Sequence, residues 1–524
     1  MFFNIKKNVS KHIFCRMHAI RLPLQKSRYN SKPLTYSLIE NISRRGFLKT
    51  MGTATAGVLL TGTAANAAEQ LSELADRKKK TKETVPETPK VKLACVGIAN
   101  RGRQIIQDFE RTGLCEIVAL CDVDPQSKES QLTIAEHPGA KVFTDFREMF
   151  DKAASTFEAV SVAIPDFSHF PVCMLAISEG KHVYVEKPMA RTFLEVELMM
   201  DIARRHPEVV TQVGNQGHSE ANYFQFKAWK EAGIIKDVYS IDAHFNDWRR
   251  WYPYDTNIQR YPEGEPVPTG MDWDKWLTTA RYHDYNGKYH PGNWRGWYDF
   301  GLGVLGDWGA HILDTCHEFL ELGLPYRVEP LKLTGVNDFF FPKETTLRFK
   351  FPSRADMPPV DVTWYDGEKN LPPLPEGFGE QSVVNDDVPA TNQTGQHAPA
   401  KLSPGKIIYS RELTFKGGTH GATLEIIPKE KAVEMADKMP EVPKSPSNHF
   451  ANFLLACQGK EKTRSPFHIF GPMAQMFALG IIAIRTQSTI TFDSTKKEIV
   501  WNPFANALLA GEPPRKGWDE FYKL

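Results

Sequence analysis

The sequence predicts an α/β protein whose first folded part contains a doubly wound parallel sheet. Residues 91–122 show strand, glycine turn, helix and strand in succession. Two further apolar runs, 159–164 and 182–185, end in prolyl or charged residues. The chain has 524 residues, 41% of them hydrophobic and 24% charged, which is enough to bury the cores of two domains.

The composition argues against several classes of partner and site. The 64 basic and 63 acidic residues leave a net charge of +1, which gives no broad attraction for nucleic acid or an anionic membrane. The seven cysteines show no CxxC spacing, and Cys95 and Cys121 fall in predicted buried strands. A disulfide framework or zinc knuckle is therefore not expected.

Residues 1–67 are predicted to be an N-terminal extension and an export signal. Arg44 and Arg45 precede a weakly apolar stretch that ends at the small-residue cleavage site 65–67. The stretch is too short for a permanent membrane span. This pattern predicts twin-arginine export to the periplasm, and the alternative is a basic helix start on a surface helix. Residues 68–90 are charged, end in prolines and are predicted to be a linker.

The strand at 91–96 leads into a turn with the G-x-G/A-x-x-G pattern of dinucleotide-binding folds. Gly97 makes the tight turn, Ala99 lets the backbone approach a pyrophosphate, and Gly102 lets the following helix pack closely. The free N–H groups at the helix start favour phosphate oxygens. The alternative is a doubly wound sheet whose glycines only form a turn.

An acidic residue follows the second strand of this unit. A carboxylate at the position of Asp122 accepts hydrogen bonds from a ribose 2′-hydroxyl and repels a 2′-phosphate. The sequence therefore predicts NAD as the cofactor, in preference to NADP.

The next two strands end in polar residues that we expect at the cofactor crevice. Ligands of open α/β sheets bind beyond the carboxyl ends of strands. A cis Lys187–Pro188 bond is predicted because it would fix the direction of the lysine; the alternative for Lys187 is a solvated strand-end charge. The predicted cofactor-binding residues are Gly97, Ala99, Asn100, Arg101, Gly102, Asp122, Pro165, Asp166, His169, Glu186 and Lys187.

These segments resemble the glucose–fructose oxidoreductase, inositol dehydrogenase and rhizopine catabolism (Gfo/Idh/MocA) family. The glycine turn, "AIPDFSHF", "VYVEKPMA" and Asp307-x-x-x-His311 occur in the family's order, and the resemblance extends from about residue 91 to the C-terminus. It implies a Rossmann domain, 91–215, and a substrate and oligomerisation α/β domain, 216–524, with an open, mostly antiparallel sheet.

The resemblance also implies Lys187, Asp307 and His311 as catalytic residues, and a homo-oligomer, either a dimer or a tetramer. A glycosidase branch of this family uses NAD without net oxidation and lacks the lysine of the EKP tripeptide. Lys187 therefore counts against that branch.

Asp307 and His311 lie four residues apart in "LGDWGAHILDT", a spacing that places both on one side of a helical turn. As a structural pair in the core, Asp307 and His311 would cost free energy to bury. Glycines 301, 303, 306 and 309 would also be unusual neighbours, because glycine destabilises a helix. Metal ligands would need a third partner, and no tight ligand spacing appears among the nearby histidines, so no metal is predicted. In an acid/base unit His311 takes a proton from a sugar hydroxyl, and the glycines admit substrate and nicotinamide.

Residues 245–310 hold seven of the eleven tryptophans, interleaved with arginines and amides, an arrangement that suits sugar binding. The alternative is that most of these tryptophans belong to the core or to an oligomer interface. The predicted substrate-binding residues are Trp294, Arg295, Asn215 and His218. Residues 365–407 are proline-rich and predicted to be a surface insertion.

Together these patterns predict an exported NAD-dependent oxidoreductase that acts on a small carbohydrate, with no permanent membrane span. We expect the protein to retain its cofactor tightly, because we expect no pool of free NAD in the periplasm. An NAD-dependent glycosidase and a non-catalytic cofactor-binding protein are the alternatives.

Overall fold

The computed structural model describes residues 89–247, 257–355, 357–378 and 403–524. Residues Thr88–Leu524 form one compact unit. The predicted export signal and most of the linker, Trp248, Trp251, and most of the predicted proline-rich insertion lie outside the described residues.

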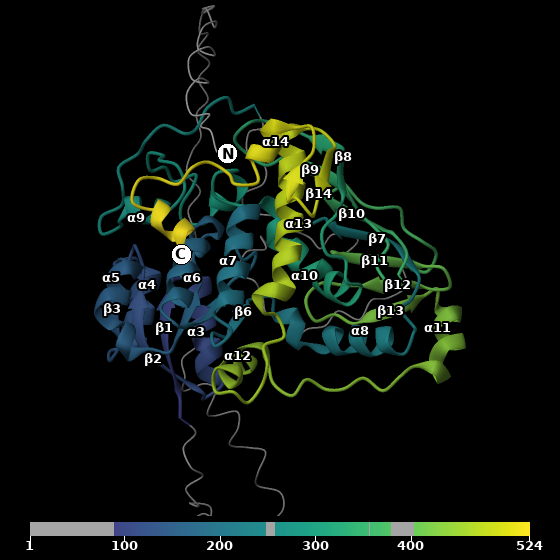
Figure 1. Ribbon diagram of the computed structural model, residues 1–524, viewed down its shortest axis with the longest axis horizontal. Helices are drawn as coiled ribbons and strands as arrows, with labels where there is room; N and C mark the ends of the chain where they lie inside the picture. The colour runs from purple at the N-terminus through teal and green to yellow at the C-terminus, as the bar shows by residue number, and fades with distance from the viewer. Residues whose placement is uncertain (1–88, 248–256, 356, 379–402) are drawn as a thin grey trace, which may run out of the picture. The chain divides into compact units, whose positions relative to one another are not determined.

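A six-stranded parallel sheet forms the first half of this unit, in the order β3-β2-β1-β4-β5-β6 (Figure 1). Its strands are β1 Val91–Val96, β2 Cys115–Cys121, β3 Lys141–Phe143, β4 Ala159–Val162, β5 His182–Val185 and β6 Thr211–Val213. The accompanying helices are α3 Arg101–Arg111, α4 Lys128–Glu136, α5 Phe146–Ala153, α6 His169–Ser178 and α7 Phe193–Arg205. The predicted doubly wound sheet is confirmed.

The order of this sheet places the predicted cofactor residues at one edge. The sheet grows outward from β1 and β4 in opposite directions, so a crevice opens at the carboxyl ends of these two strands. Gly97 follows β1, Asp166 lies shortly after β4, and Glu186 follows β5. The loop after β1, the turn after β4 and the segment after β5 therefore meet at the same edge of the parallel sheet.

A nine-stranded, mostly antiparallel sheet forms the second half, in the order β13-β12-β11-β7-β10-β9-β8-β14-β15, with only the β7–β10 pair parallel. Its strands are β7 Val238–Phe245, β8 Arg327–Thr334, β9 Glu344–Phe351, β10 Val360–Asp366, β11 Gly405–Ser410, β12 Thr414–Gly417, β13 Leu424–Ile427, β14 Ile490–Asp493 and β15 Glu498–Ile499. The predicted C-terminal α/β architecture is confirmed.

Helices α8 Ala221–Glu231, α10 Gly303–Phe319 and α13 Phe467–Thr486 pack on this sheet and on one another (Figure 1). The other helices are α9 Trp273–Leu277, α11 Lys429–Met435, α12 His449–Cys457 and α14 Pro503–Ala507. Short 3-10 turns occur at Ala154–Thr156, Asp166–Ser168, Gln216–Ser219, Asn293–Gly296, Ala436–Lys438 and Asp519–Lys523.

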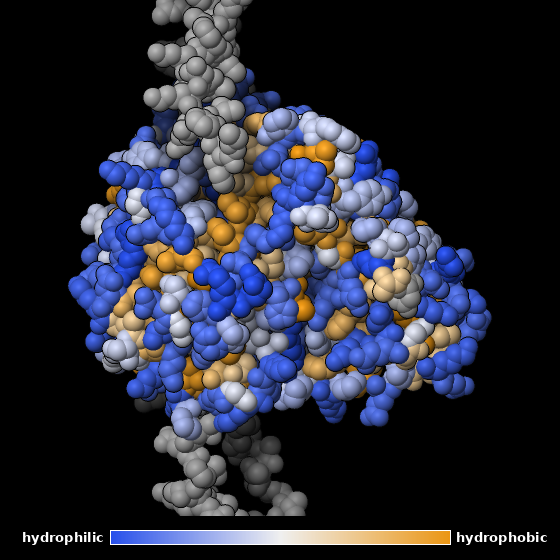
Figure 2. Space-filling view, in the orientation of Figure 1, coloured by the Kyte–Doolittle hydropathy of each residue, from blue (hydrophilic) through white to orange (hydrophobic). Residues whose placement is uncertain are grey.

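Helix α13 is apolar because it is a core helix. In the part of the chain that the structure describes, it alone has the length and hydropathy of a membrane span, but 83% of its apolar window is buried inside the protein. It packs against α7, α10 and β8. Figure 2 shows apolar side chains near α7 and α13 and mostly hydrophilic ones elsewhere on the face in view.

The last part of the chain returns to the parallel sheet. Phe450 of α12 packs edge-on against Phe109 of α3 at 5.1 Å, and Trp518 and Phe521 pack against Phe146 of α5. Residues after 216 therefore complete the core of the first half, a contribution that the expectation of two consecutive domains did not include.

Candidate active site

The glycine loop after β1 is shaped by close backbone contacts. Gly97 has φ +83°, and a Cβ there would lie 2.3 Å from the carbonyl oxygen of Ala163. A Cβ on Gly102 would lie 2.0 Å from the carbonyl oxygen of Gly97. Only glycine fits at either position, so β1 turns directly into α3, and the N–H of Gly102 closes the turn by donating to the carbonyl oxygen of Ala99 at 2.8 Å.

Asp122 fastens this loop to the end of β2. Its Oδ2 accepts the N–H of Ile98 at 3.0 Å and its Oδ1 accepts the N–H of Asp124 at 3.0 Å. Burial raises the pKa of Asp122, and these backbone N–H groups oppose the rise. Carboxylate oxygens retain further lone pairs for a ribose hydroxyl. The glycine loop after β1 fits the pyrophosphate of NAD, and the neighbouring carboxylate of Asp122 fits its ribose.

Lys187 points from the end of β5 to α10. The Lys187–Pro188 bond is cis, as predicted. The Lys187 Nζ lies 2.6 Å from Oδ1 of Asp307 and donates to the carbonyl oxygen of Asp307 at 2.9 Å. Burial lowers the pKa of Lys187, and the negative charge of Asp307 opposes that shift. An ammonium has three donors, so one remains beyond these two contacts.

Arg295 joins this pair to the loop after β4. Its Nη1 donates to Oδ1 of Asp307 at 3.1 Å and its Nη2 to Oδ1 of Asp166 at 3.0 Å. We call Asp166, Lys187, Arg295 and Asp307 the lysine cluster. Burial raises the pKa of Asp166 to about 6, against the opposing charges of Arg295 and Lys187.

Some buried polar atoms in and beside the lysine cluster are poorly satisfied. Nε of Arg295 has no hydrogen-bond partner among the described residues, while Asp166 and His169 each have a backbone contact, to Leu302 and Met189. Nε2 of His169 contacts the carbonyl oxygen of Ile164 at 2.8 Å, and burial lowers the pKa of His169 to about 4. Buried polar atoms are nearly always satisfied, so Nε of Arg295 indicates a place where a polar ligand or water binds.

Glu186 connects the start of α3 to the end of β5. Its Oε1 lies 3.3 Å from Nη2 of Arg101. Asn100 precedes α3 with φ 46°. The predicted residues of the glycine loop and of the EKP segment therefore form one continuous edge.

One face of α10 carries Asp307, His311, Asp314 and Glu318, spaced four, three and four residues apart. His311 is 3% exposed, and its ring stacks on that of His420 at 4.0 Å and 21°. His420 comes from the loop between β12 and β13, and its N–H donates to the carbonyl oxygen of His311 at 2.9 Å. Burial lowers the pKa of His420 to about 4, so its imidazole is neutral at pH 7.

His420 is not among the site residues predicted from the sequence. The only local signal is a lone histidine in the glycine-rich run "KGGTHGAT", and its pairing with α10 is visible only in the folded sheet.

Further along the same face, His218 lies between two carboxylates. Its Nδ1 is 3.0 Å from Oδ2 of Asp314, and its Nε2 is 2.6 Å from Oε2 of Glu318. Burial opposes protonation of His218, but the two carboxylates outweigh burial and raise its pKa to about 9. We call His218, Asp314 and Glu318 the histidine cluster. Nδ2 of Asn215 lies 2.9 Å from His218, so these two predicted substrate residues belong to this cluster.

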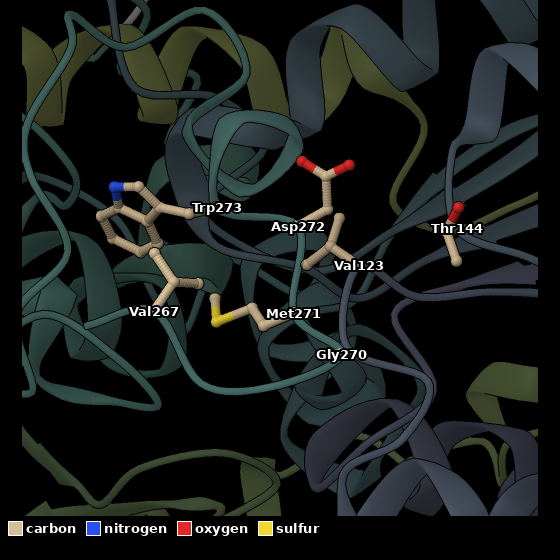
Figure 3. Close-up of a pocket in the computed structure, with 7 residues that line it drawn as sticks. All are labelled: Val123, Thr144, Val267, Gly270, Met271, Asp272 and Trp273. Atoms are coloured by element: carbon tan, nitrogen blue, oxygen red, sulfur yellow. The ribbon is translucent and has the colours of Figure 1, made fainter.

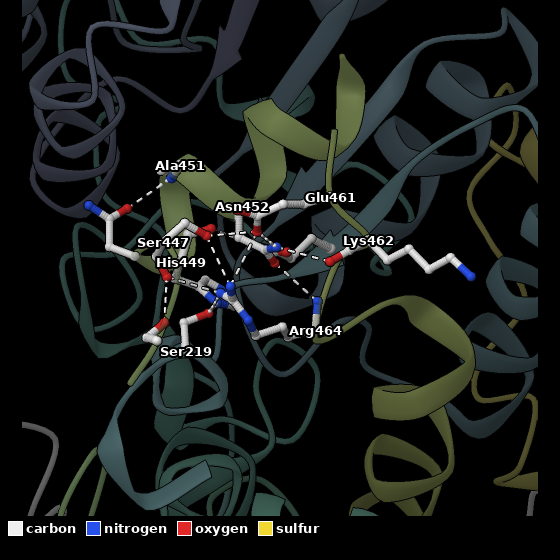
Figure 4. Close-up of polar contacts among 11 residues, drawn as sticks. Ser219, Ser447, His449, Ala451, Asn452, Glu461, Lys462 and Arg464 are labelled. Carbon is white, nitrogen blue, oxygen red and sulfur yellow. Dashed lines mark hydrogen bonds and ion pairs between the residues drawn. The ribbon is translucent and has the colours of Figure 1, made fainter. Parts of the chain in front are cut away.

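A second polar network holds the turn that carries His218 (Figure 4). Arg464 donates to Oγ of Ser219 at 2.9 Å, and Nδ1 of His449 lies 2.9 Å from the same oxygen. Burial lowers the pKa of His449 to about 3, and its Nε2 contacts the carbonyl oxygen of Val213 at 2.8 Å. A neutral His449 with its proton on Nε2 satisfies both contacts. The network anchors the Gln216–Ser219 turn to α12.

The glycines around Asp307 have a different role from the one predicted. A Cβ on Gly309 would lie 2.9 Å from the Phe477 ring of α13, and one on Gly301 would lie 2.5 Å from the carbonyl oxygen of Arg295. The Cβ of Gly306 would lie 2.4 Å from that of Leu302. The interpretation that these glycines admit substrate and nicotinamide is wrong, since they allow α10 to pack closely against protein atoms.

The described tryptophans of the aromatic segment favour the core alternative. All are buried: Trp273, Trp276, Trp294, Trp297 and Trp308. Trp294 also lies 4.4 Å from the guanidinium of Arg295, which gives it a place beside the lysine cluster. Across the described ranges, His, Cys, Asp and Glu side chains form no group of three arranged to hold a metal ion.

Comparison with known proteins matches both halves. Residues 91–214 match the oxidoreductase family with an NAD-binding Rossmann fold (GFO_IDH_MocA), and residues 237–329 match the C-terminal α/β domain of the same family. A glycosyl hydrolase family 109 protein of Shewanella amazonensis is 26% identical over 252 residues, 42% of this chain and 53% of that protein. The chain thus spans about half the length of the curated relatives that it matches.

The WlbA dehydrogenases show the same fold. Those of Chromobacterium violaceum and Bordetella pertussis, each solved with NADH and UDP-GlcNAcA, are 14% identical with a TM-score of 0.51. They cover 78% and 77% of this chain and 99% of their own. Residues 91–214 and 237–329 thus match the NAD-binding Rossmann domain and the C-terminal domain of the Gfo/Idh/MocA oxidoreductases, and the prediction of NAD as cofactor is confirmed.

Proposed function

We propose that this protein is an NAD-dependent oxidoreductase that transfers hydride to or from a hydroxyl-bearing carbon of a sugar, glycoside or polyol. One observation carries the proposal. The lysine cluster lies beyond the carboxyl ends of β4 and β5, where this fold binds its cofactor, and it buries Nε of Arg295 without a hydrogen-bond partner among the described residues.

Each side chain has a defined task in this reaction. Bound NAD supplies the hydride acceptor. Lys187 binds the substrate hydroxyl with its third N–H and stabilises negative charge on that oxygen. Asp307 holds Lys187 in position through the 2.6 Å contact. His311 takes the hydroxyl proton, so that a carbonyl forms as the C–H hydrogen leaves with its electron pair.

The carbohydrate assignment is supported by the relatives. The WlbA structures contain a sugar nucleotide, UDP-GlcNAcA, and the Shewanella relatives are named glycosyl hydrolases. The names of the Shewanella relatives favour the second candidate, a glycosidase that oxidises its sugar only transiently. Lys187 in the EKP tripeptide favours net oxidoreduction.

A two-signal assay separates the two candidates. The NAD-loaded protein is mixed with free sugars, polyols and p-nitrophenyl glycosides, and the absorbances of NADH and p-nitrophenol are followed. We expect NADH to accumulate with a free sugar or polyol. Release of p-nitrophenol without net NADH would establish the glycosidase instead. Neither signal, with NAD bound normally, would support the non-catalytic binding protein.

We further propose export by the twin-arginine route, a retained cofactor, homo-oligomeric assembly, and domain boundaries at 91–215 and 216–524. The pair Arg44 and Arg45 supports export, because transport of a folded chain allows NAD to be loaded first. Replacement of both arginines by lysine is expected to leave the protein in the cytoplasm on cell fractionation. Unchanged periplasmic recovery would contradict the export proposal.

A further inference from the structure

A cavity of about 420 Å³ lies at the carboxyl ends of β2 and β3 (Figure 3). Two of its lining residues come from the parallel sheet: Val123 follows Asp122 beyond β2, and Thr144 follows β3. The others are Val267, Gly270, Met271, Asp272 and Trp273, which lie beyond β7 in the chain. A segment from outside the Rossmann domain therefore forms one wall of a cavity on its sheet.

This cap segment, residues 267–273, is attached directly to the parallel sheet. The N–H of Asp272 donates to the carbonyl oxygen of Val123 at 2.8 Å. Gly270 has φ +89°, and a Cβ there would lie 2.7 Å from the side chain of Gln126. The segment is thus in close contact with the loop that follows Asp122.

The C-terminal end of the cap segment is anchored in the core. Trp273 stacks on Trp276 at 4.4 Å and 12°, and its Nε1 donates to the carbonyl oxygen of His283 at 2.7 Å. Arg515 of the C-terminal tail adds a hydrogen bond to the carbonyl oxygen of Thr278 at 3.1 Å, just after α9. Displacement of the cap segment near Trp273 would break these contacts.

The cavity has the chemistry of an adenosine site. Val123, Val267, Met271 and Trp273 supply apolar walls for a flat base, and Thr144 supplies a hydroxyl. Asp122, adjacent to Val123, is the acid predicted to bind the ribose. We propose that the cap segment forms the outer wall of the adenosine site and slows the release of bound NAD.

This inference deepens the retained-cofactor proposal, and it requires NAD binding but not redox chemistry. Its physical basis is that a nucleotide held between Val123 of the Rossmann half and the cap segment loses its contacts with both when it leaves. Val267 is suited to a test because it lines the cavity while its side chain is 42% exposed, so substitution spares the core.

The test compares Val267→Glu with Val433→Glu. Val433 is 69% exposed on α11, outside the cavity lining, and is the matched control. NADH release is timed by chasing bound NADH with excess NAD and following its fluorescence. Binding of ADP and of nicotinamide mononucleotide is measured separately, because each carries one half of the cofactor.

For Val267→Glu we expect NADH release about tenfold faster and ADP binding about tenfold weaker, since an acidic group is placed at the wall of the base. Nicotinamide mononucleotide binding and the control variant are expected to match the wild type. Met271→Ala, which removes apolar wall without adding charge, is expected to change ADP binding and NADH release in the same direction by a smaller factor.

Wild-type NADH release and ADP affinity in both cavity variants would overturn the inference. So would an equal loss of nicotinamide mononucleotide binding, because that result indicates a general distortion. Failure of the proposed function looks different: the wild type would bind NADH and release it slowly, yet turn over none of the carbohydrates.

Discussion

Two charged clusters share one face of α10, and they differ in where they lie relative to the parallel sheet. In the histidine cluster both ring nitrogens of His218 lie within 3.0 Å of a carboxylate oxygen. The lysine cluster lies beyond the carboxyl ends of β4 and β5, and Nε of Arg295 there has no hydrogen-bond partner in the described part of the chain. Only the lysine cluster is therefore placed where this fold binds its ligands.

The comparison shows how to separate structural from functional buried charge. Both clusters are nearly inaccessible and both contain perturbed pKa values, so neither burial nor pKa distinguishes them. The distinguishing feature is the position of the lysine cluster at the carboxyl ends of the parallel strands. Substitutions in the lysine cluster should therefore lower activity, and those in the histidine cluster should lower stability.

The largest expected effect is that of Lys187→Met on turnover. Loss of the ammonium removes the group that we propose stabilises the substrate oxygen, so we expect kcat to fall about 10²–10⁴-fold with NADH binding unchanged. Lys181→Met, just before β5 on the same segment, is the control. Wild-type turnover in Lys187→Met would remove Lys187 from the catalytic mechanism.

His218→Ala should have its main effect on stability. Removal of the imidazolium leaves the buried carboxylates of Asp314 and Glu318 without their partner, which typically costs about 3–5 kcal/mol. His317→Ala on the same helix is the control, because burial lowers the pKa of His317 to about 4 and its ring is neutral. Urea unfolding of both variants measures the difference. Equal losses of stability would contradict the charged histidine cluster.

The same cluster predicts a pH dependence. The pKa of His218 is raised to about 9 in the folded protein, above about 6.5 in an unfolded chain. Its contribution to stability is therefore complete below pH 6.5 and is lost as the pH rises through 9, a change on the order of 3 kcal/mol. The unfolding free energy of the wild type should fall relative to that of His218→Ala across this window. A constant difference would show that His218 is not protonated.

The smallest expected effect is at His420. His420→Ala removes the ring stacked on His311 and should lower kcat about tenfold, or about 1.4 kcal/mol, without changing NADH release. His420→Phe keeps a stacked ring and should retain most of the activity. If both variants lose activity equally, His420 acts through its nitrogen atoms. If neither loses activity, the stack has no role in turnover.

The parallel sheet was predictable because buried parallel strands appear as continuous apolar runs. The runs at 91–96 and 182–185 coincide with β1 and β5. The spacing of Asp307 and His311 correctly placed both on one helix, a feature that depends on local pattern. The association of Lys187 with Asp307 came from the family resemblance, and the structure places these two side chains in contact.

Features that depend on distant contacts were not predictable in this way. His420 contacts His311 because the loop between β12 and β13 lies against α10, and Arg464 contacts Ser219, which lies 245 residues earlier in the chain. The glycines of α10 were assigned to ligand access because their true neighbours, such as Phe477, lie far along the chain. Local sequence pattern identified most of the candidate site residues, whereas contacts between distant parts of the chain determine how their side chains are positioned.

The most direct test of the account is the identification of nucleotides released by denaturing the purified protein, with detection by mass spectrometry. The account predicts near-stoichiometric NAD or NADH, retained by the crevice beside the lysine cluster and by the cap segment. Protein that is folded but empty, or that releases NADP, would contradict a retained NAD as the partner of this site.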